Sequence, residues 1–191
     1  WNLLSDVGNG TVNKILIDPT NTNKIYCSAE YGGIFKSTNG GLNWTNILTN
    51  TTENFSDVKF RDNNFGIATV NSSNYYKSTN GGATWQSIDL INQNNLSQIY
   101  FVSSKTLIKS GNQLVDTDGG RSITLPNPVS KVQFLNATKS IGIGQHYDIG
   151  FYPYGDIILT NDNWATFSQK SYQFSSEAGD FTAIAKMNNH K

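Results

Sequence analysis

Hydrophobic and polar residues alternate over short stretches along much of the chain. Val58 and Phe60, for example, alternate with Lys59 and Arg61. A period of two residues is typical of β-strands that bury one face. Long stretches of the helix-favouring residues Ala, Glu, Lys and Leu are missing from the sequence. The pattern therefore predicts an all-β protein built from short strands.

A short turn motif recurs along the chain. STNGGLNW at residues 37–44 returns as STNGGATW at 78–85. A third copy occupies residues 116–123, and a degenerate fourth copy, with Asn163 and Trp164 in place of the two glycines, occupies 160–167. The copies begin 41, 38 and 44 residues apart, close to the roughly 40 residues of a four-stranded propeller blade. The repeat predicts about four such blades.

With these four turn motifs as anchors, four antiparallel strands fall into each repeat. The repeats span residues 12–48, 55–90, 96–126 and 129–172 and are expected to form one propeller domain. The expected strands are Val12–Asp18, Lys24–Ala29, Ile34–Ser37 and Trp44–Leu48; Ser56–Phe60, Gly66–Val70, Tyr75–Ser78 and Thr84–Ile88; Ser97–Val102, Lys105–Lys109, Gln113–Asp116 and Arg121–Leu125; and Ser130–Phe134, Ser140–Gly144, Asp156–Thr160 and Thr166–Ser171. Turns between first and second strands are expected at Asn21–Asn23, Arg61–Asn64 and Asn136–Thr138.

The turn motifs resemble the Asp-box, or BNR repeat, of the propeller superfamily that includes sialidases, xyloglucanases, sortilin-type receptors and photosystem assembly factors. The resemblance implies that each motif joins the third and fourth strands of a blade. An Asp or Asn side chain caps such a turn, and glycines adopt its left-handed conformations. We therefore expect a structural role for the capping residues, Asn39, Asn80, Asp118 and Asp162. The Asn163-Trp164 pair is expected to give the fourth turn a different shape.

The two ends of the sequence resemble incomplete blades. Trp1–Leu4 is similar to a fourth strand, and Phe181–Ala185 is similar to a first strand. In this superfamily an N-terminal fourth strand commonly joins the C-terminal blade. We therefore expect a mature form or a piece of a longer protein, with the remaining blades supplied by the same chain or by another chain.

The composition excludes several classes of partner. Lys plus Arg and Asp plus Glu both number 14, so the formal net charge is zero and there is no basic surface for nucleic acid. No apolar run approaches the ~20 residues of a membrane span. Cys27 is the single cysteine, which excludes an internal disulfide and a cysteine-based metal site. We expect no cofactor and no metal.

Ligands are expected at the loops opposite the turn motifs, where second strands connect to third strands. Glu30 and Tyr31 lie in the first of these loops. The fourth is a longer insertion, Gln145–Gly155, whose aromatic and polar residues suit contacts with a sugar or a peptide. Its candidate binding residues are His146, Tyr147, Asp148, Tyr152 and Tyr154. A β-hairpin extension that packs on its own blade is the alternative interpretation.

Glu30 is the acid best placed for catalysis. The run from Glu30 to Gly33 resembles the Asp-x-Gly-Gly of the first blade in xyloglucan-cleaving endoglucanases, with Glu in place of Asp. The resemblance implies a catalytic carboxylate, but glycoside hydrolysis generally needs a pair and the sequence identifies no partner acid. A sialidase is disfavoured because its site resembles three clustered arginines, whereas this chain has Arg61 and Arg121 alone.

Two functions remain open. The first is a non-catalytic propeller module, secreted or at the cell surface, that binds a glycan or a protein. The second is a fragment of a secreted, xyloglucanase-like glycoside hydrolase. Glycosylation sequons at Asn9, Asn43, Asn54 and Asn136 fit secretion.

Overall fold

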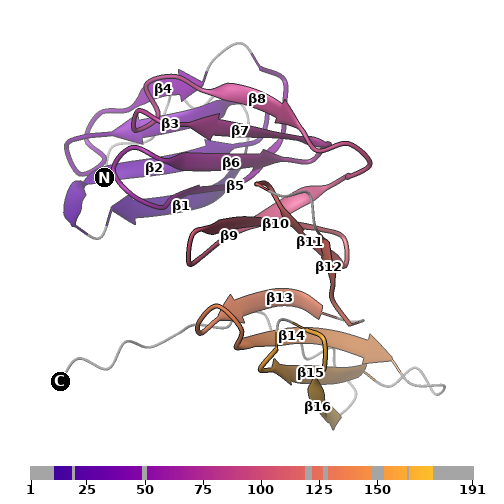
Figure 1. The fold of residues 1–191 in the computed structure, drawn as a ribbon. Coiled ribbons are helices and arrows are strands. Elements are labelled where there is room, and N and C mark those ends of the chain that lie inside the picture. Colours follow the sequence, from indigo (N-terminus) through magenta and orange to yellow (C-terminus); the bar gives the residue numbers. More distant parts are fainter. Residues whose placement is uncertain are drawn as a thin grey trace. The chain divides into compact units, whose positions relative to one another are not determined.

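The computed structural model describes residues 11–18, 20–48, 51–118, 122–126, 129–147, 153–162 and 164–173. Every regular element in these ranges is a β-strand (Figure 1). The strands form four sheets of four, and each sheet follows chain order, so that every strand neighbours the next one along the chain. The predicted all-β architecture of four-stranded antiparallel sheets is confirmed. The described part of the chain contains no helix that is long and apolar enough to cross a membrane.

Each sheet corresponds to one sequence repeat. The first contains β1 (Val12–Asp18), β2 (Asn21–Ala29), β3 (Gly33–Ser37) and β4 (Thr45–Leu48). The second contains β5 (Phe55–Phe60), β6 (Gly66–Val70), β7 (Asn74–Ser78) and β8 (Gln86–Asp89). The third contains β9 (Leu96–Val102), β10 (Lys105–Ser110), β11 (Gln113–Asp116) and β12 (Ser122–Thr124). The fourth contains β13 (Val129–Phe134), β14 (Ser140–Tyr147), β15 (Pro153–Thr160) and β16 (Ser168–Gln173).

Two of the three expected first-to-second turns are found where the sequence predicts them. Asp62 caps the turn after β5 by accepting the backbone N–H of Asn64 at 2.9 Å, and Asn136 caps the turn after β13 in the same way. The expected turn at Asn21–Asn23 is wrong, because β2 already begins at Asn21. Asp18 instead caps the turn one step earlier, through the backbone N–H of Thr20 at 2.8 Å.

The chain divides into two compact units. The first comprises residues 1–99 and 108–111, and the second comprises residues 100–107 and 112–191. The division passes through the third sheet, so its first two strands, β9 and β10, each contribute to both units. Residues 1–4 and 181–185, which resemble incomplete blades in the sequence, lie outside the described residues.

The core of the first unit lies between the first and second sheets. Tyr26 and Ile34 from the first sheet pack with Phe55, Val58 and Val70 from the second, and all five side chains are almost fully buried. Burying such a side chain contributes roughly 1.5–3 kcal/mol. The alternation seen in the sequence has its cause here, because Val58 points into this core.

The core of the second unit joins the remainder of the third sheet to the fourth. Leu107 and Leu114 pack with Val132, Ile158 and Trp164. A hydrogen bond crosses the same layer, since the backbone N–H of Val132 donates to the hydroxyl of Tyr100 at 3.3 Å.

The first two turn motifs are held by identical hydrogen bonds. In the first, Asn39 accepts the backbone N–H of Asn43 at 2.9 Å, and the hydroxyl of Ser37 accepts the N–H of Gly41 at 2.9 Å. In the second motif, Asn80 and Ser78 make the equivalent bonds to Thr84 and Gly82. The second glycine of each motif has a positive φ, +88° at Gly41 and +84° at Gly82, a conformation that favours glycine.

The fourth turn motif keeps this arrangement without its glycines. Asp162 accepts the N–H of Thr166 at 2.9 Å, and the hydroxyl of Thr160 accepts the N–H of Trp164 at 3.0 Å. Trp164 adopts a φ of +68° in the position of the second glycine. The expectation of a differently shaped turn is therefore wrong for the described residues. The capping oxygens fix the backbone, and Trp164 accepts the strain.

Two aromatic residues exchange roles in the fourth motif. Phe167 takes the position of the motif tryptophan, yet it is 50% exposed. Trp164 is 6% exposed and packs over Gly142, where an added Cβ would lie only 2.8 Å from the indole ring. The buried ring of this sheet thus comes from the turn itself instead of from the residue before the last strand.

Candidate functional site

Glu30 lies in the connection between β2 and β3, where the sequence predicts a ligand-binding loop. Its backbone N–H donates to the carbonyl of Thr11 at 2.8 Å. Its carboxylate accepts a hydrogen bond from the Asn54 side-chain amide at 3.4 Å. Asn54 precedes β5, so this contact ties the connection within the first sheet to the connection between the first two sheets.

Tyr31 is presented to solvent by a constrained turn. Its φ is +56° and its side chain is 67% exposed. Gly33, two residues later, has a φ of +88°, and a Cβ there would overlap the carbonyl oxygen of Leu48. The side-chain amide of Asn46, on β4, stabilises the turn by donating to the carbonyl of Gly32 at 2.8 Å. A bulky residue with positive φ is strained, and such strain concentrates at functional sites.

Asn54 links several elements at this end of the first unit. Its side-chain oxygen accepts from the Asn13 amide at 3.0 Å, and the same amide donates to the carbonyl of Phe55 at 2.8 Å. The carbonyl of Asn54 accepts the backbone N–H of Asn71 at 3.0 Å. The turn that carries Glu30 and Tyr31 is therefore anchored to its own sheet and to the second sheet.

A partly buried ion pair that sequence reasoning missed lies on β5 in the first unit. Asp57 is 4% exposed, accepts the backbone N–H of Ile99 at 3.1 Å and lies 3.9 Å from the ammonium of Lys59. Lys59 donates to the carbonyl of Ile99 at 2.6 Å. Burial raises the pKa of Asp57 and lowers the pKa of Lys59. The two-residue spacing of Asp57 and Lys59 places both side chains on one face of a strand, and the sequence shows that. The contact with Ile99, 42 residues away, could not be predicted from the sequence. The pair fastens β5 to β9.

The aromatic insertion Gln145–Gly155 is, at its base, a continuation of two strands. β14 extends to Tyr147 and β15 begins at Pro153, with His146 opposite Tyr154 and Tyr147 opposite Pro153. The expected strand ends at Gly144 and Asp156 are therefore wrong, because aromatic residues favour the paired, extended backbone. Asp148 and Tyr152 lie outside the described residues, as do the side chains of His146 and Tyr147.

The sequence-predicted site residues belong to different units. Glu30 and Tyr31 lie side by side in the first unit, whereas Tyr154 is a half-buried residue of β15 in the second unit. Tyr154 also lies opposite Gln173 of β16, so its backbone is paired on both sides. Within the described ranges, no group of three or more His, Cys, Asp or Glu side chains could hold a metal ion.

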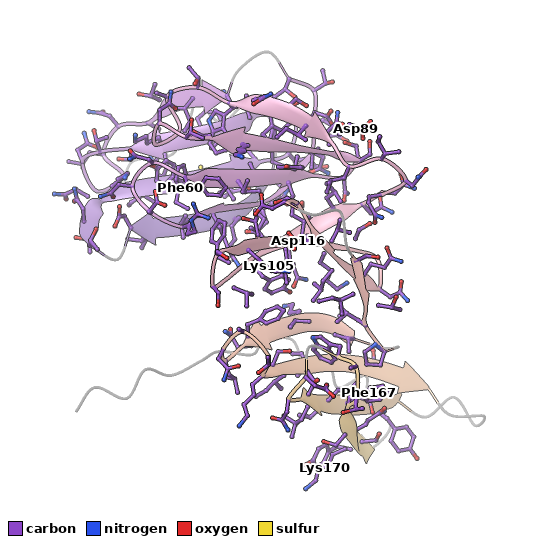
Figure 2. The ribbon with its side chains drawn as sticks, in the orientation of Figure 1. Phe60, Asp89, Lys105, Asp116, Phe167 and Lys170 are labelled. Atoms are coloured by element: carbon purple, nitrogen blue, oxygen red, sulfur yellow. The ribbon has the colours of Figure 1, made fainter. Side chains whose placement is uncertain are left out.

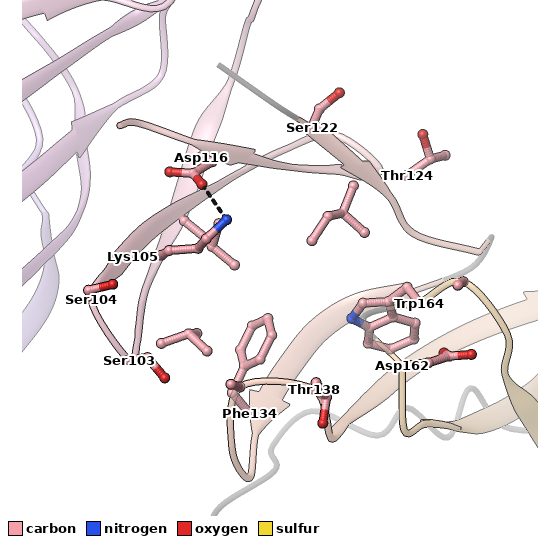
Figure 3. Close-up of a pocket in the computed structure, with 15 residues that line it drawn as sticks. Ser103, Ser104, Lys105, Asp116, Ser122, Thr124, Phe134, Thr138, Asp162 and Trp164 are labelled. Atoms are coloured by element: carbon pink, nitrogen blue, oxygen red, sulfur yellow. Dashed lines mark hydrogen bonds and ion pairs between the residues drawn. The ribbon is translucent and has the colours of Figure 1, made fainter. Parts of the chain in front are cut away.

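The second unit contains a cavity that the sequence did not predict (Figure 3). Its volume is about 550 Å³, and Leu107, Phe134 and Trp164 form its apolar wall. Its polar rim includes an ion pair of 3.0 Å between Lys105 and Asp116, which lie close together in the third sheet (Figure 2).

No protein-family model and no curated protein sequence matches this chain. Solved β-propellers are similar to it in fold. An ancestral GH74 enzyme covers 83% of the chain at 16% identity, with a TM-score of 0.62. The GH74 xyloglucanase from Xanthomonas campestris covers 81% at 11% identity, with a TM-score of 0.61. YCF48 bound to D1 peptide covers 88% at 14% identity, with a TM-score of 0.52.

These similarities show the fold, which is that of a β-propeller. The chain spans 25% and 29% of the lengths of the two GH74 proteins and 70% of the length of the YCF48 protein. Its four-stranded antiparallel sheets are the blades of this fold.

Proposed function

We propose that this chain is a non-catalytic Asp-box propeller module, secreted or displayed at the cell surface, that binds a partner protein or a glycan. The four repeats form blades of one propeller domain, and further blades come from the same chain or another chain. The shared hydrogen bonds of the turn motifs support the Asp-box assignment, because Ser37, Ser78 and Thr160 cap their turns in the same way.

The turn that presents Tyr31 is the observation that carries the proposal. A tyrosine with 67% exposure, held on a strained and hydrogen-bonded turn, loses little conformational freedom when it binds. Tyrosine also combines apolar area with a hydrogen-bonding group, and for this reason it is enriched in binding surfaces. Glu30 directly precedes Tyr31 in the same loop, with its carboxylate held by Asn54. Of the two partner classes, a protein is favoured by the peptide-bound structure of YCF48.

The test begins with ligand selection. The purified chain is panned against a random peptide library and probed on a glycan array, and the best ligand is titrated by calorimetry. Tyr31→Ala should weaken that ligand by about tenfold, or ~1.4 kcal/mol, as expected for an aromatic contact at the centre of an interface.

Leu42→Ala is the matched control. Leu42 has the same 67% exposure in the same sheet, but it lies in the turn motif between β3 and β4. This variant should bind within twofold of the parent, and both variants should keep the parent's melting temperature. Equal losses in the two variants, or no loss in either, would refute the proposed surface.

The insertion supplies a second contact in this proposal, through His146, Tyr147, Asp148, Tyr152 and Tyr154. Tyr154→Ala tests it, because a binding role predicts weaker ligand binding at an unchanged melting temperature. A packing role predicts a lower melting temperature with ligand binding unchanged.

A fragment of a secreted glycoside hydrolase is the second candidate, and the GH74 likeness in fold favours it. Here Glu30 would act as one of two carboxylates about 5–9.5 Å apart. The protein that contains this chain would then release reducing sugar from xyloglucan, and Glu30→Gln would abolish that release while leaving substrate binding intact. A protein that shows no hydrolysis at any pH excludes this candidate.

A further inference from the structure

The cavity of the second unit lies at the same place in its sheets as a filled position in the first unit. Phe60 ends β5 opposite Gly66, and Phe134 ends β13 opposite Ser140. Tyr26 and Leu107 are each the third residue of a run that starts with a lysine, Lys24 or Lys105. Each packs in the core that contains the corresponding phenylalanine. Leu107 therefore stands where the first unit has Tyr26.

In the first unit an aromatic ring occupies this position. The rings of Tyr26 and Phe60 stack with their centroids 4.2 Å apart. The Tyr26 hydroxyl donates to the carbonyl of Gly81 at 3.3 Å, and the Lys24 ammonium lies 5.7 Å from the centre of the ring. The corresponding cleft, which is lined by Tyr26 and Phe60, has a volume of about 250 Å³.

In the second unit the ring is missing from this side. Among the described residues, the aromatic contact of Phe134 is with Tyr100 on β9, an edge-on contact with centroids 5.4 Å apart. Tyr100 takes no part in the cavity wall, and its hydroxyl already accepts the N–H of Val132. The side of Phe134 next to Leu107 faces about 550 Å³ of space, more than twice the volume of the corresponding cleft.

A buried donor in the cavity wall lacks a partner. Trp164 is only 6% exposed, and its indole N–H makes no hydrogen bond to any residue in the described part of the chain. Figure 3 shows the indole nitrogen on the side of Trp164 that is turned toward Phe134. Leaving such a donor unsatisfied costs about 1–3 kcal/mol. A ring that carries an oxygen acceptor would satisfy it.

We propose that this cavity binds a tyrosine side chain of a partner polypeptide. The ring stacks on Phe134 as Tyr26 stacks on Phe60. The phenolic oxygen accepts the indole N–H of Trp164. Lys105 takes the place of Lys24 beside the ring. This site is separate from the Tyr31 surface and does not depend on it.

N-acetyl-tyrosinamide is the probe, and the indole N–H resonance of Trp164 in a ¹H–¹⁵N spectrum is the signal. We expect saturable binding near 1 mM, because a ligand of this size gains roughly 0.3 kcal/mol per heavy atom. N-acetyl-phenylalaninamide, which lacks the hydroxyl, should bind at least fivefold more weakly. Methyl glucoside should leave the resonance unchanged.

Two variants block the cavity in different ways. Leu107→Tyr restores the ring found in the first unit and should abolish probe binding without lowering the melting temperature. Thr138→Trp places a bulky side chain at the exposed rim and should weaken binding at least tenfold even if the core variant fails to fold. Thr45→Trp, an exposed position on β4 in the first unit, is the matched control and should bind normally.

The outcomes separate this proposal from the proposed function. Tyr31→Ala should leave probe binding unchanged, because Tyr31 is not part of the cavity. If the probe does not bind the cavity, the proposed function of the Tyr31 surface is unaffected. Binding that survives Thr138→Trp would overturn the assigned site. Equal binding of the phenylalanine amide, or a shift caused by methyl glucoside, would overturn the assignment to tyrosine.

Discussion

Replacing Trp164 by glycine tests why the fourth turn motif keeps its shape. The substitution restores the residue found at the equivalent positions, Gly41 and Gly82. It relieves the positive φ of +68° at Trp164, but it also removes a ring that is 6% exposed and packs over Gly142. The two effects on stability have opposite signs.

The magnitudes predict that the loss of packing wins. Truncating a buried aromatic side chain costs about 3–5 kcal/mol. A left-handed backbone at a non-glycine residue costs about 1–2 kcal/mol, which the glycine recovers. The expected net loss is therefore about 1–4 kcal/mol, and it should lower the melting temperature by roughly 2–16 °C in a chain of this size.

Differential scanning calorimetry measures the loss, with Phe167→Ala as the control. Phe167 is 50% exposed, so its truncation should lower the melting temperature by a small fraction of that amount. The double variant Trp164→Gly, Phe167→Trp restores the second glycine and the tryptophan of the first two motifs and should recover part of the loss. A neutral Trp164→Gly, or a larger loss in Phe167→Ala, would refute the exchange of roles between the two rings.

Two titration predictions follow from buried or hydrogen-bonded groups. Hydrogen bonds from Thr20 lower the pKa of Asp18 from 3.8 to about 2, so its stabilising effect is present above pH 4 and disappears as pH falls through 2. Urea unfolding should therefore show Asp18→Asn less stable than the parent at pH 5, with the gap shrinking as pH falls through about 2 and closing near pH 1, and a gap that is undiminished at pH 1 contradicts this. Burial raises the pKa of Cys27 to about 11. The thiol should therefore resist a disulfide reagent at pH 8 until urea unfolds the chain. Rapid reaction of the native protein would show that Cys27 is accessible to solvent and that β2 is not packed as described.

The parts of the fold that the sequence predicted are those with local causes. The hydrogen bonds of the turn motifs close within five residues, for example from Thr84 to Asn80. A short pattern therefore contains the whole interaction. Alternation in Val58–Phe60 works in the same way, because the strand period alone decides which side chains face the core. The Asn163-Trp164 pair led to the wrong prediction of a differently shaped fourth turn. The fourth motif keeps capping residues at the same positions as the first two motifs, and these fix the backbone even though the left-handed position holds Trp164 instead of glycine.

The candidate site depends on contacts that are distant in sequence. Glu30 meets Asn54 across 24 residues, and Asp57 meets Ile99 across 42. Neither partner stands out from the many other polar residues of the chain. The sequence identified Glu30 and Tyr31 as a loop pair, but the strain at Tyr31 and its anchoring by Asn46 required the backbone.

Differences between repeats are more informative here than the features that they share. The shared turns specify the blades, and they appear in all repeats whatever each blade binds. A position that departs from its equivalents while remaining in a well-packed core needs a cause of its own. Leu107 in place of Tyr26 opens a space, and Trp164 in place of glycine directs an unsatisfied N–H toward it. Each change by itself would only destabilise the second unit. The two lie in the wall of the same cavity, and a ring with a polar oxygen would offset both costs, which is why this cavity is the better place to seek a partner's side chain than the conserved turns.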